Sequence, residues 1–76
     1  MFDYSALRGK IKEVYGTEFR FADALELSSN SLSAKLNNKT QWTQNEINAA
    51  VQLLAIDYSE ISKYFFTGKV QETEQS

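Results

Sequence analysis

Residues 17–39 read TEFRFADALELSSNSLSAKLNNK, a pattern that predicts two short helices joined by a tight corner. Thr17 is the expected N-cap of the first helix, which spans about residues 18–25. The apolar residues of this helix recur at spacings that place them on one face, and they are Phe21, Ala22 and Leu25. The two helices together predict a helix-turn-helix.

The second helix of this pair is expected to follow the N-cap Ser28 and to span about residues 29–37. Only Leu32 and Leu36 form its apolar stripe. Its other positions are small or polar: Ser29, Asn30, Ser31, Ser33, Ala34, Lys35 and Asn37. Such a face can approach another surface closely and hydrogen-bond it, as a helix in a DNA major groove must. Asn37 and Asn38 are expected to end the helix, because asparagine tolerates the left-handed conformation.

The run from Thr17 to Lys39 resembles the helix-turn-helix of phage repressor and Cro-like proteins. The opening FDYSALRGKIKEVYGT and the closing YFFTGKV are similar to a family of small phage regulators catalogued as a domain of unknown function, so the resemblance covers nearly the whole chain. Ala22 and Leu32 match the small and branched positions of the family pattern, whereas the corner carries Glu26 in place of glycine. That corner commonly needs a positive φ, which costs a non-glycine residue roughly 1 kcal/mol.

The flanking sequence predicts three more helices, and therefore an all-α, five-helix, lambda-repressor-like helix-turn-helix domain over residues 1–70. The first, about residues 5–15, buries Leu7, Ile11, Val14 and Tyr15 and ends at Gly16. The fourth begins with a capping box, Thr43 with Glu46, and the fifth runs from about Tyr58 to Phe65 or Phe66 after the cap Asp57. The expected core is Leu7, Ile11, Phe21, Ala22, Leu25, Leu32, Leu36, Ile47, Val51, Leu54 and Ile61.

Three segments outside these helices carry separate expectations. Phe19 does not share the stripe of its helix, and it is expected to act as a lid on the first helix, with an exposed contact residue as the alternative. Trp42 is expected to form a hydrophobic staple onto Ile47, with base stacking as the functional alternative. Residues 71–76 are polar and are expected to form a disordered tail.

Composition excludes several classes of function. The 76 residues contain no cysteine and no histidine, so no disulfide, thiolate nucleophile or ordinary zinc site is expected. Acid-base catalysis would have to rest on carboxylates in cap and surface positions, so we expect neither an enzyme nor a cofactor. No signal peptide or apolar stretch of membrane-spanning length is present, which predicts a cytoplasmic protein of the host bacterial cell.

The charge distribution bears on DNA binding. The net charge is −2, but residues 1–40 carry six basic and five acidic residues, while residues 41–76 carry two basic and five acidic ones. The acidic excess therefore lies outside the helix-turn-helix. We expect weaker non-specific DNA binding than a strongly basic repressor shows.

These features favour a phage-type transcriptional regulator, a Cro-like repressor that binds operator double-stranded DNA with the helix of about residues 29–37. The candidate base contacts are Ser28, Ser29, Asn30, Ser33 and Ala34. The candidate phosphate contacts are Thr17, Glu18, Arg20, Lys35, Asn38 and Lys39. A homodimer on DNA is expected, and the candidate partner or dimer interface comprises Tyr58, Tyr64, Phe65 and Phe66. The alternative for these aromatic residues is that they pack onto Phe2 and Tyr4 at the N-terminus. The alternative is an antirepressor-like protein that keeps the fold but binds and modulates another phage regulator, through the C-terminal aromatic residues or Phe19.

Overall fold

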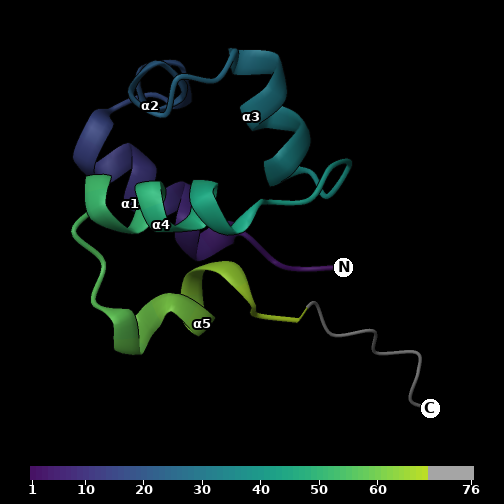
Figure 1. The fold of residues 1–76 in the computed structure, drawn as a ribbon, viewed down its shortest axis with the longest axis vertical. Helices are drawn as coiled ribbons and strands as arrows, with labels where there is room; N and C mark the ends of the chain where they lie inside the picture. Colours follow the sequence, from purple (N-terminus) through teal and green to yellow (C-terminus); the bar gives the residue numbers. More distant parts are fainter. Residues whose placement is uncertain (69–76) are drawn as a thin grey trace.

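The computed structural model describes residues 1–68, which form five α-helices and one 3-10 turn (Figure 1). The α-helices are α1 (Ser5–Tyr15), α2 (Glu18–Ala24), α3 (Ser29–Leu36), α4 (Gln44–Leu53) and α5 (Ile61–Phe65), and the turn η1 (Tyr58–Glu60) leads into α5. Within residues 1–68 the only β-pairing is an isolated antiparallel bridge between Phe2 and Gly68. The prediction of an all-α, five-helix domain with a helix-turn-helix is confirmed, and the predicted tail 71–76 lies outside the described residues.

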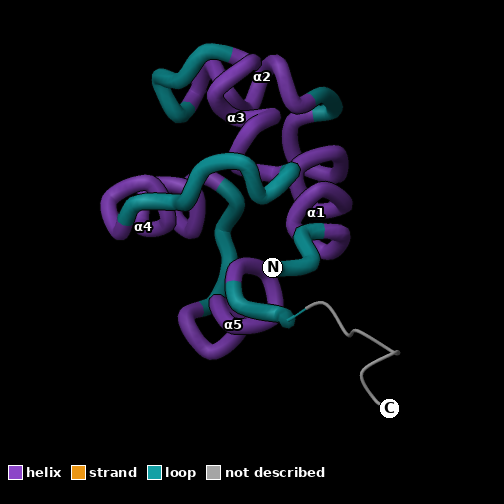
Figure 2. Tube along the Cα trace, turned by 90° about the vertical axis from the view of Figure 1, so that its right-hand side faces the viewer, coloured by secondary structure: helices purple, strands orange, loops and turns teal. Residues whose placement is uncertain are grey.

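The helix-turn-helix and the C-terminal helix lie at opposite ends of the molecule. Figures 1 and 2, two perpendicular views, both place α2 and α3 at the top of the longest axis and α5 at the bottom. Helices α1 and α4 lie between them, so the core runs through the middle of the domain. No helix in the described part of the chain is long and apolar enough to cross a membrane.

Side-chain caps determine where α2, α3 and α4 begin, as the sequence predicts. The Thr17 and Ser28 hydroxyls accept hydrogen bonds from the third backbone N–H of their helices, at 3.2 Å and 3.1 Å. At α4 the capping box is complete, since the Thr43 hydroxyl accepts from Glu46 N (3.1 Å) and the Glu46 carboxylate accepts from Thr43 N (2.9 Å). These bonds satisfy amides that have no partner inside the helix.

Left-handed residues end the helices. Gly16 closes α1 at φ 84°, and Glu26 forms the corner of the helix-turn-helix at φ 63°, as predicted. Asn38 follows α3 at φ 63°, which confirms the asparagine stop. Ala55 adopts φ 54° after α4, a turn that the sequence did not indicate. The left-handed region is strained for residues with a Cβ. The backbone conformation of Glu26 therefore costs free energy, which the surrounding packing must offset.

The core contains most of the residues predicted for it. Leu25, Ile47 and Ile61 are half-buried, and the other eight predicted core residues are buried. The core also takes up five further residues: Tyr4, Ala50, Ile56, Tyr64 and Phe65. The core is therefore more aromatic than predicted, and its extra rings come from the N-terminal segment and α5.

Two predicted packing roles are wrong. Val14 is 45% exposed, because in the last turn of α1 the ring of Tyr15 packs against Phe21 instead (centroids 5.3 Å apart). Phe19 is 70% exposed and so is no lid on α1. It stands two positions before Phe21, and a helix turns by roughly 200° over that interval, so burying Phe21 directs Phe19 to the opposite side.

Candidate functional site

The outer face of α3 lies open to the surface. Ser29, Asn30 and Ser33 are exposed, and Ala34 is half-buried, so these four predicted base contacts are on an accessible face. The fifth, Ser28, is also exposed, but its hydroxyl caps α3 and contacts the Ser31 hydroxyl at 3.0 Å. This face is polar and uncharged, and it offers hydrogen-bonding groups without cations.

The predicted phosphate contacts are mostly engaged within the protein. Lys35 is only 8% exposed, and its ammonium lies 3.0 Å from the Glu46 carboxylate and donates to the Gln41 carbonyl (3.1 Å). Glu18 accepts from Arg8 at 2.9 Å. The side chain of Asn38 is bonded to the backbone of Phe2.

Only two of the predicted phosphate-binding cations remain available. Arg20 and Lys39 are exposed, and neither forms an ion pair with another residue in the range 1–68. The hydroxyl of Thr17 is used as the cap of α2, although its residue is exposed. Because each neutralised phosphate adds to affinity through counterion release, a face with so few free cations is poorly equipped to bind the DNA backbone.

The Lys35–Glu46 pair ties α3 to the start of α4. Burial acts to raise the pKa of the Glu46 carboxyl, but the hydrogen bond from the Thr43 backbone and the bond and charge of Lys35 outweigh it, so this pKa is lowered from 4.5. Glu46 therefore stays ionised at neutral pH and pairs with the ammonium of Lys35. The ammonium of Lys35 is therefore not available to bind a phosphate group of DNA.

Two of the four aromatic residues predicted for the partner interface are exposed, and two are buried. Tyr64 and Phe65 are 8% and 1% exposed and belong to the core, which corrects their assignment to a partner surface. Tyr58 and Phe66 are 69% and 50% exposed and are free to meet a second molecule. The sequence shows a surplus of aromatic residues here, but it does not show which ones the core uses.

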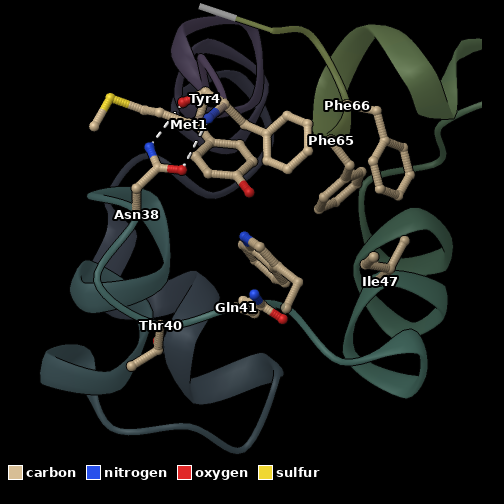
Figure 3. Close-up of a pocket in the computed structure, with 10 residues that line it drawn as sticks. Met1, Tyr4, Asn38, Thr40, Gln41, Ile47, Phe65 and Phe66 are labelled. Carbon is tan, nitrogen blue, oxygen red and sulfur yellow. Dashed lines mark hydrogen bonds between the residues drawn. The ribbon is translucent and has the colours of Figure 1, made fainter.

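An aromatic pocket of about 510 Å³ opens between the N-terminus, the loop after α3, α4 and the end of α5 (Figure 3). Its lining residues are Met1, Phe2, Tyr4, Asn38, Thr40, Gln41, Trp42, Ile47, Phe65 and Phe66. The rings interlock, with Trp42 edge-on to Phe65 at 5.1 Å and Phe2 edge-on to Phe66 at 5.8 Å. Edge-to-face pairs of this kind are favourable beyond the area that they bury.

Packing of a C-terminal aromatic residue onto the N-terminus, one of the two alternatives from the sequence, is confirmed by the contact of Phe2 with Phe66, but the sequence does not indicate the pocket as a unit. Trp42 and Ile47 line it together, as partners in a staple would, but the ring of Trp42 also packs on Tyr4 (6.4 Å) and Phe65. The pocket joins residues 1–4, 38–47 and 65–66, three stretches that are far apart in the chain, so no local periodicity indicates it. Its one sequence signal is the density of aromatic residues at both ends of the domain.

Tyr4 is the one titratable side chain among the residues that line the pocket. Burial raises the pKa of the Tyr4 hydroxyl from 10.0, so this hydroxyl stays neutral, and no carboxylate lines the wall. The volume lies within the range of roughly 300–1,000 Å³ that is usual for ligand sites. Its lining combines aromatic rings with polar groups of Asn38, Thr40 and Gln41.

Comparison with known proteins identifies a family and a similar solved structure. A family model described as "Protein of unknown function (DUF739)" matches residues 1–68. A solved structure, the solution structure of the modulator of repression (MOR) of the temperate bacteriophage TP901-1 from Lactococcus lactis, has 47% sequence identity and a TM-score of 0.77. The match covers 92% of this chain and 95% of that chain. No curated protein matches this chain.

Proposed function

This chain belongs to the family described as protein of unknown function (DUF739), and we propose that it is an antirepressor-like modulator that binds a phage repressor protein. The observation that carries the proposal is its likeness to a phage modulator of repression over nearly the full length of both chains. At that identity the two proteins share more than a general fold. A role in modulating repression then makes another regulator, rather than an operator, the principal partner.

The electrostatics of the helix-turn-helix support a protein partner over DNA. Of the four basic residues nearest to this face, Arg8 and Lys35 are held in ion pairs, which leaves Arg20 and Lys39. Asp23 and Glu26 are exposed on α2 and at the corner, and they would repel phosphate. The fold of a DNA reader is thus combined with a surface that a polyanion does not favour.

The aromatic pocket is the surface that we assign to the repressor. Phe66 is half exposed at its rim, and Met1, 74% exposed, extends the apolar area. Exposed apolar residues gathered at a pocket mark interaction sites in small proteins. Homodimerisation was expected from four aromatic residues, but two of them are buried, and we propose that Phe66 contacts the repressor rather than a second copy of this chain.

The test uses the repressor of the phage that carries this gene, bound to its own operator DNA in a gel-shift assay. Added protein should release the repressor from the operator, and the two proteins should co-elute in size-exclusion chromatography. Phe66→Ala should weaken the complex by about tenfold or more, because truncating a central aromatic anchor costs over roughly 1–2 kcal/mol.

A matched control is available on the same part of the chain. Tyr58 is more exposed than Phe66 but does not line the pocket, so Tyr58→Ala should leave the complex unchanged. Equal effects of the two substitutions would remove the pocket from the interface. If this protein alone shifts operator DNA in a sequence-specific way and has no effect on the repressor, the chain would instead be a Cro-like repressor.

A further inference from the structure

The first three residues form an N-terminal strap (residues 1–3) that lies along one side of the aromatic pocket. Met1 and Phe2 line the pocket with their side chains. Phe2 pairs with Gly68 in an antiparallel bridge, and Asp3 N donates to the Thr67 carbonyl at 2.8 Å. Beyond the strap the chain is fixed, because Tyr4 is buried in the core and α1 begins at Ser5.

Asn38 holds the strap from the other side. Its Oδ1 accepts from Phe2 N at 3.0 Å and its Nδ2 donates to the Phe2 carbonyl at 2.7 Å, the two dashed lines at Asn38 in Figure 3. The amide side chain of Asn38 thus bonds both the N–H and the carbonyl of Phe2, as the backbone of a neighbouring β-strand would. Asn38 is also the left-handed residue that follows α3, so its position is determined by the end of that helix.

We propose that the N-terminal strap is a hinged wall of the aromatic pocket, and that Asn38 is the latch that holds this wall closed against the end of α3. All the bonds of the strap to Asn38 are made at the protein surface, and Phe2 is itself 39% exposed. Segments with exposed backbone bonds and few buried contacts open locally without global unfolding. When the latch is released, Met1 and Phe2 swing away, and Trp42 and Phe65 become accessible to a larger occupant.

This property goes beyond the proposed function, since it belongs to the free chain and does not depend on which partner is bound. It also gives Asn38 a role that differs from the phosphate contact expected from the sequence. The affinity of any pocket ligand that needs the open form is reduced by the fraction of molecules that are open. The bonds of Asn38 to the strap therefore determine the fraction of open molecules, and with it the apparent affinity of the pocket for such a ligand.

The experiment compares Asn38→Gly with Glu26→Gly in the free protein. Both residues have φ 63°, so glycine fits the backbone at both positions, whereas only Asn38 has an amide bonded to the strap. In Asn38→Gly, hydrogen exchange by NMR should show protection reduced about ten- to a hundredfold at the Phe2 amide, which loses its acceptor, and at the Asp3 amide, whose bond to the Thr67 carbonyl breaks when the strap swings away. Acrylamide should also quench the fluorescence of Trp42 more strongly. Glu26→Gly should change neither measurement.

Amides of α1 and α4 report whether the effect is local. Their protection should stay at the parent level in Asn38→Gly, and a uniform loss in every helix would overturn the proposal, because the strap would then be part of one cooperative unit. Unchanged protection of Phe2 and Asp3 would overturn it as well. If Asn38→Gly does not fold, Asn38→Asp decides in the same way, since aspartate keeps the acceptor for Phe2 N and tolerates the left-handed conformation but places a charged oxygen, which cannot donate, against the Phe2 carbonyl.

Discussion

Lys35 shows how the surroundings of one residue decide what its charge is used for. On the sequence it stands in a polar helix at a position suited to phosphate, and a lysine there is ordinarily solvated. In the structure its ammonium lies between the carboxylate of Glu46 and the carbonyl of Gln41. The capping box of α4 fixes Glu46 at that point, and because the box and the lysine are separated by the whole loop after α3, the sequence gives no hint that they meet.

The pKa of Glu46 leads to a prediction for stability as a function of pH. Since the folded-state pKa is lowered from 4.5, the carboxylate adds stability above the unfolded-state pKa, and this contribution is lost as pH falls through the folded-state pKa. Glu46→Gln keeps the capping-box acceptor but removes the charge. It should be less stable by roughly 1 kcal/mol at neutral pH, and its stability should fall less steeply below about pH 4.5.

Urea denaturation of parent and variant between about pH 3 and pH 7 measures this difference. Glu13→Gln is the control, because the Glu13 side chain is 70% exposed in a loose 3.9 Å pair with Lys10, and it should change stability by less than about 0.5 kcal/mol. Parallel loss of stability in the parent and in Glu46→Gln on acidification would show that another carboxylate carries the pH dependence.

At the level of elements, local chemistry was predictable and long-range packing was not. The caps Thr17, Ser28 and Thr43 and the left-handed stops at Glu26 and Asn38 depend on neighbouring residues, and all five lie where the sequence places them. Phe19 is exposed because it stands opposite Phe21 on α2, whereas the exposure of Val14 depends on how Tyr15 of α1 packs against α2. The aromatic pocket depends on segments from both ends of the chain, and periodicity within one helix carries no information about such an assembly.

Leu32 anchors α3 to the core, so its truncation should reduce the stability of the domain. Leu32 is fully buried, so Leu32→Ala removes apolar contacts and leaves a cavity, at a cost of about 2–5 kcal/mol. For a 76-residue domain this is a large part of the total stability. Chemical denaturation followed by circular dichroism measures the loss.

Val14→Ala is the matched truncation on α1. Its side chain is 45% exposed, so the substitution should change stability by less than about 0.5 kcal/mol. A loss as large as that of Leu32→Ala would place Val14 back in the core, where the sequence had predicted it. A cooperative Leu32→Ala variant with parental stability would mean that α3 does not depend on its apolar stripe.

At the scale of the whole molecule, the fold and the charge distribution favour different partners. The helix-turn-helix occupies one end of the long axis, with a polar α3 face that has the shape of a DNA reader (Figure 1). Yet the net charge is −2, and internal ion pairs take up Arg8 and Lys35. Within residues 1–68, three of the six exposed large apolar residues, Met1, Phe2 and Phe66, lie at the pocket between the strap and α5. This distribution supports the proposed protein partner.

The last prediction tests whether missing charge, and not fold, keeps α3 from DNA. Asn30 and Ser33 are exposed three positions apart on one face of α3, so Asn30→Lys with Ser33→Lys places two cations together on it. The parent should bind a fluorescent duplex weakly and only at low salt, with little preference for sequence. The double variant should bind more tightly, and the slope of log affinity against log salt should steepen by up to about 0.9 for each phosphate that it neutralises.

Anisotropy titrations over a range of salt concentrations measure both the affinity and the slope. A variant with Asn30→Gln and Ser33→Thr controls for the change of side chains without added charge. If the parent already binds one duplex sequence tightly at physiological salt, the deficit of cations does not limit DNA binding, and α3 must be a reader of bases after all.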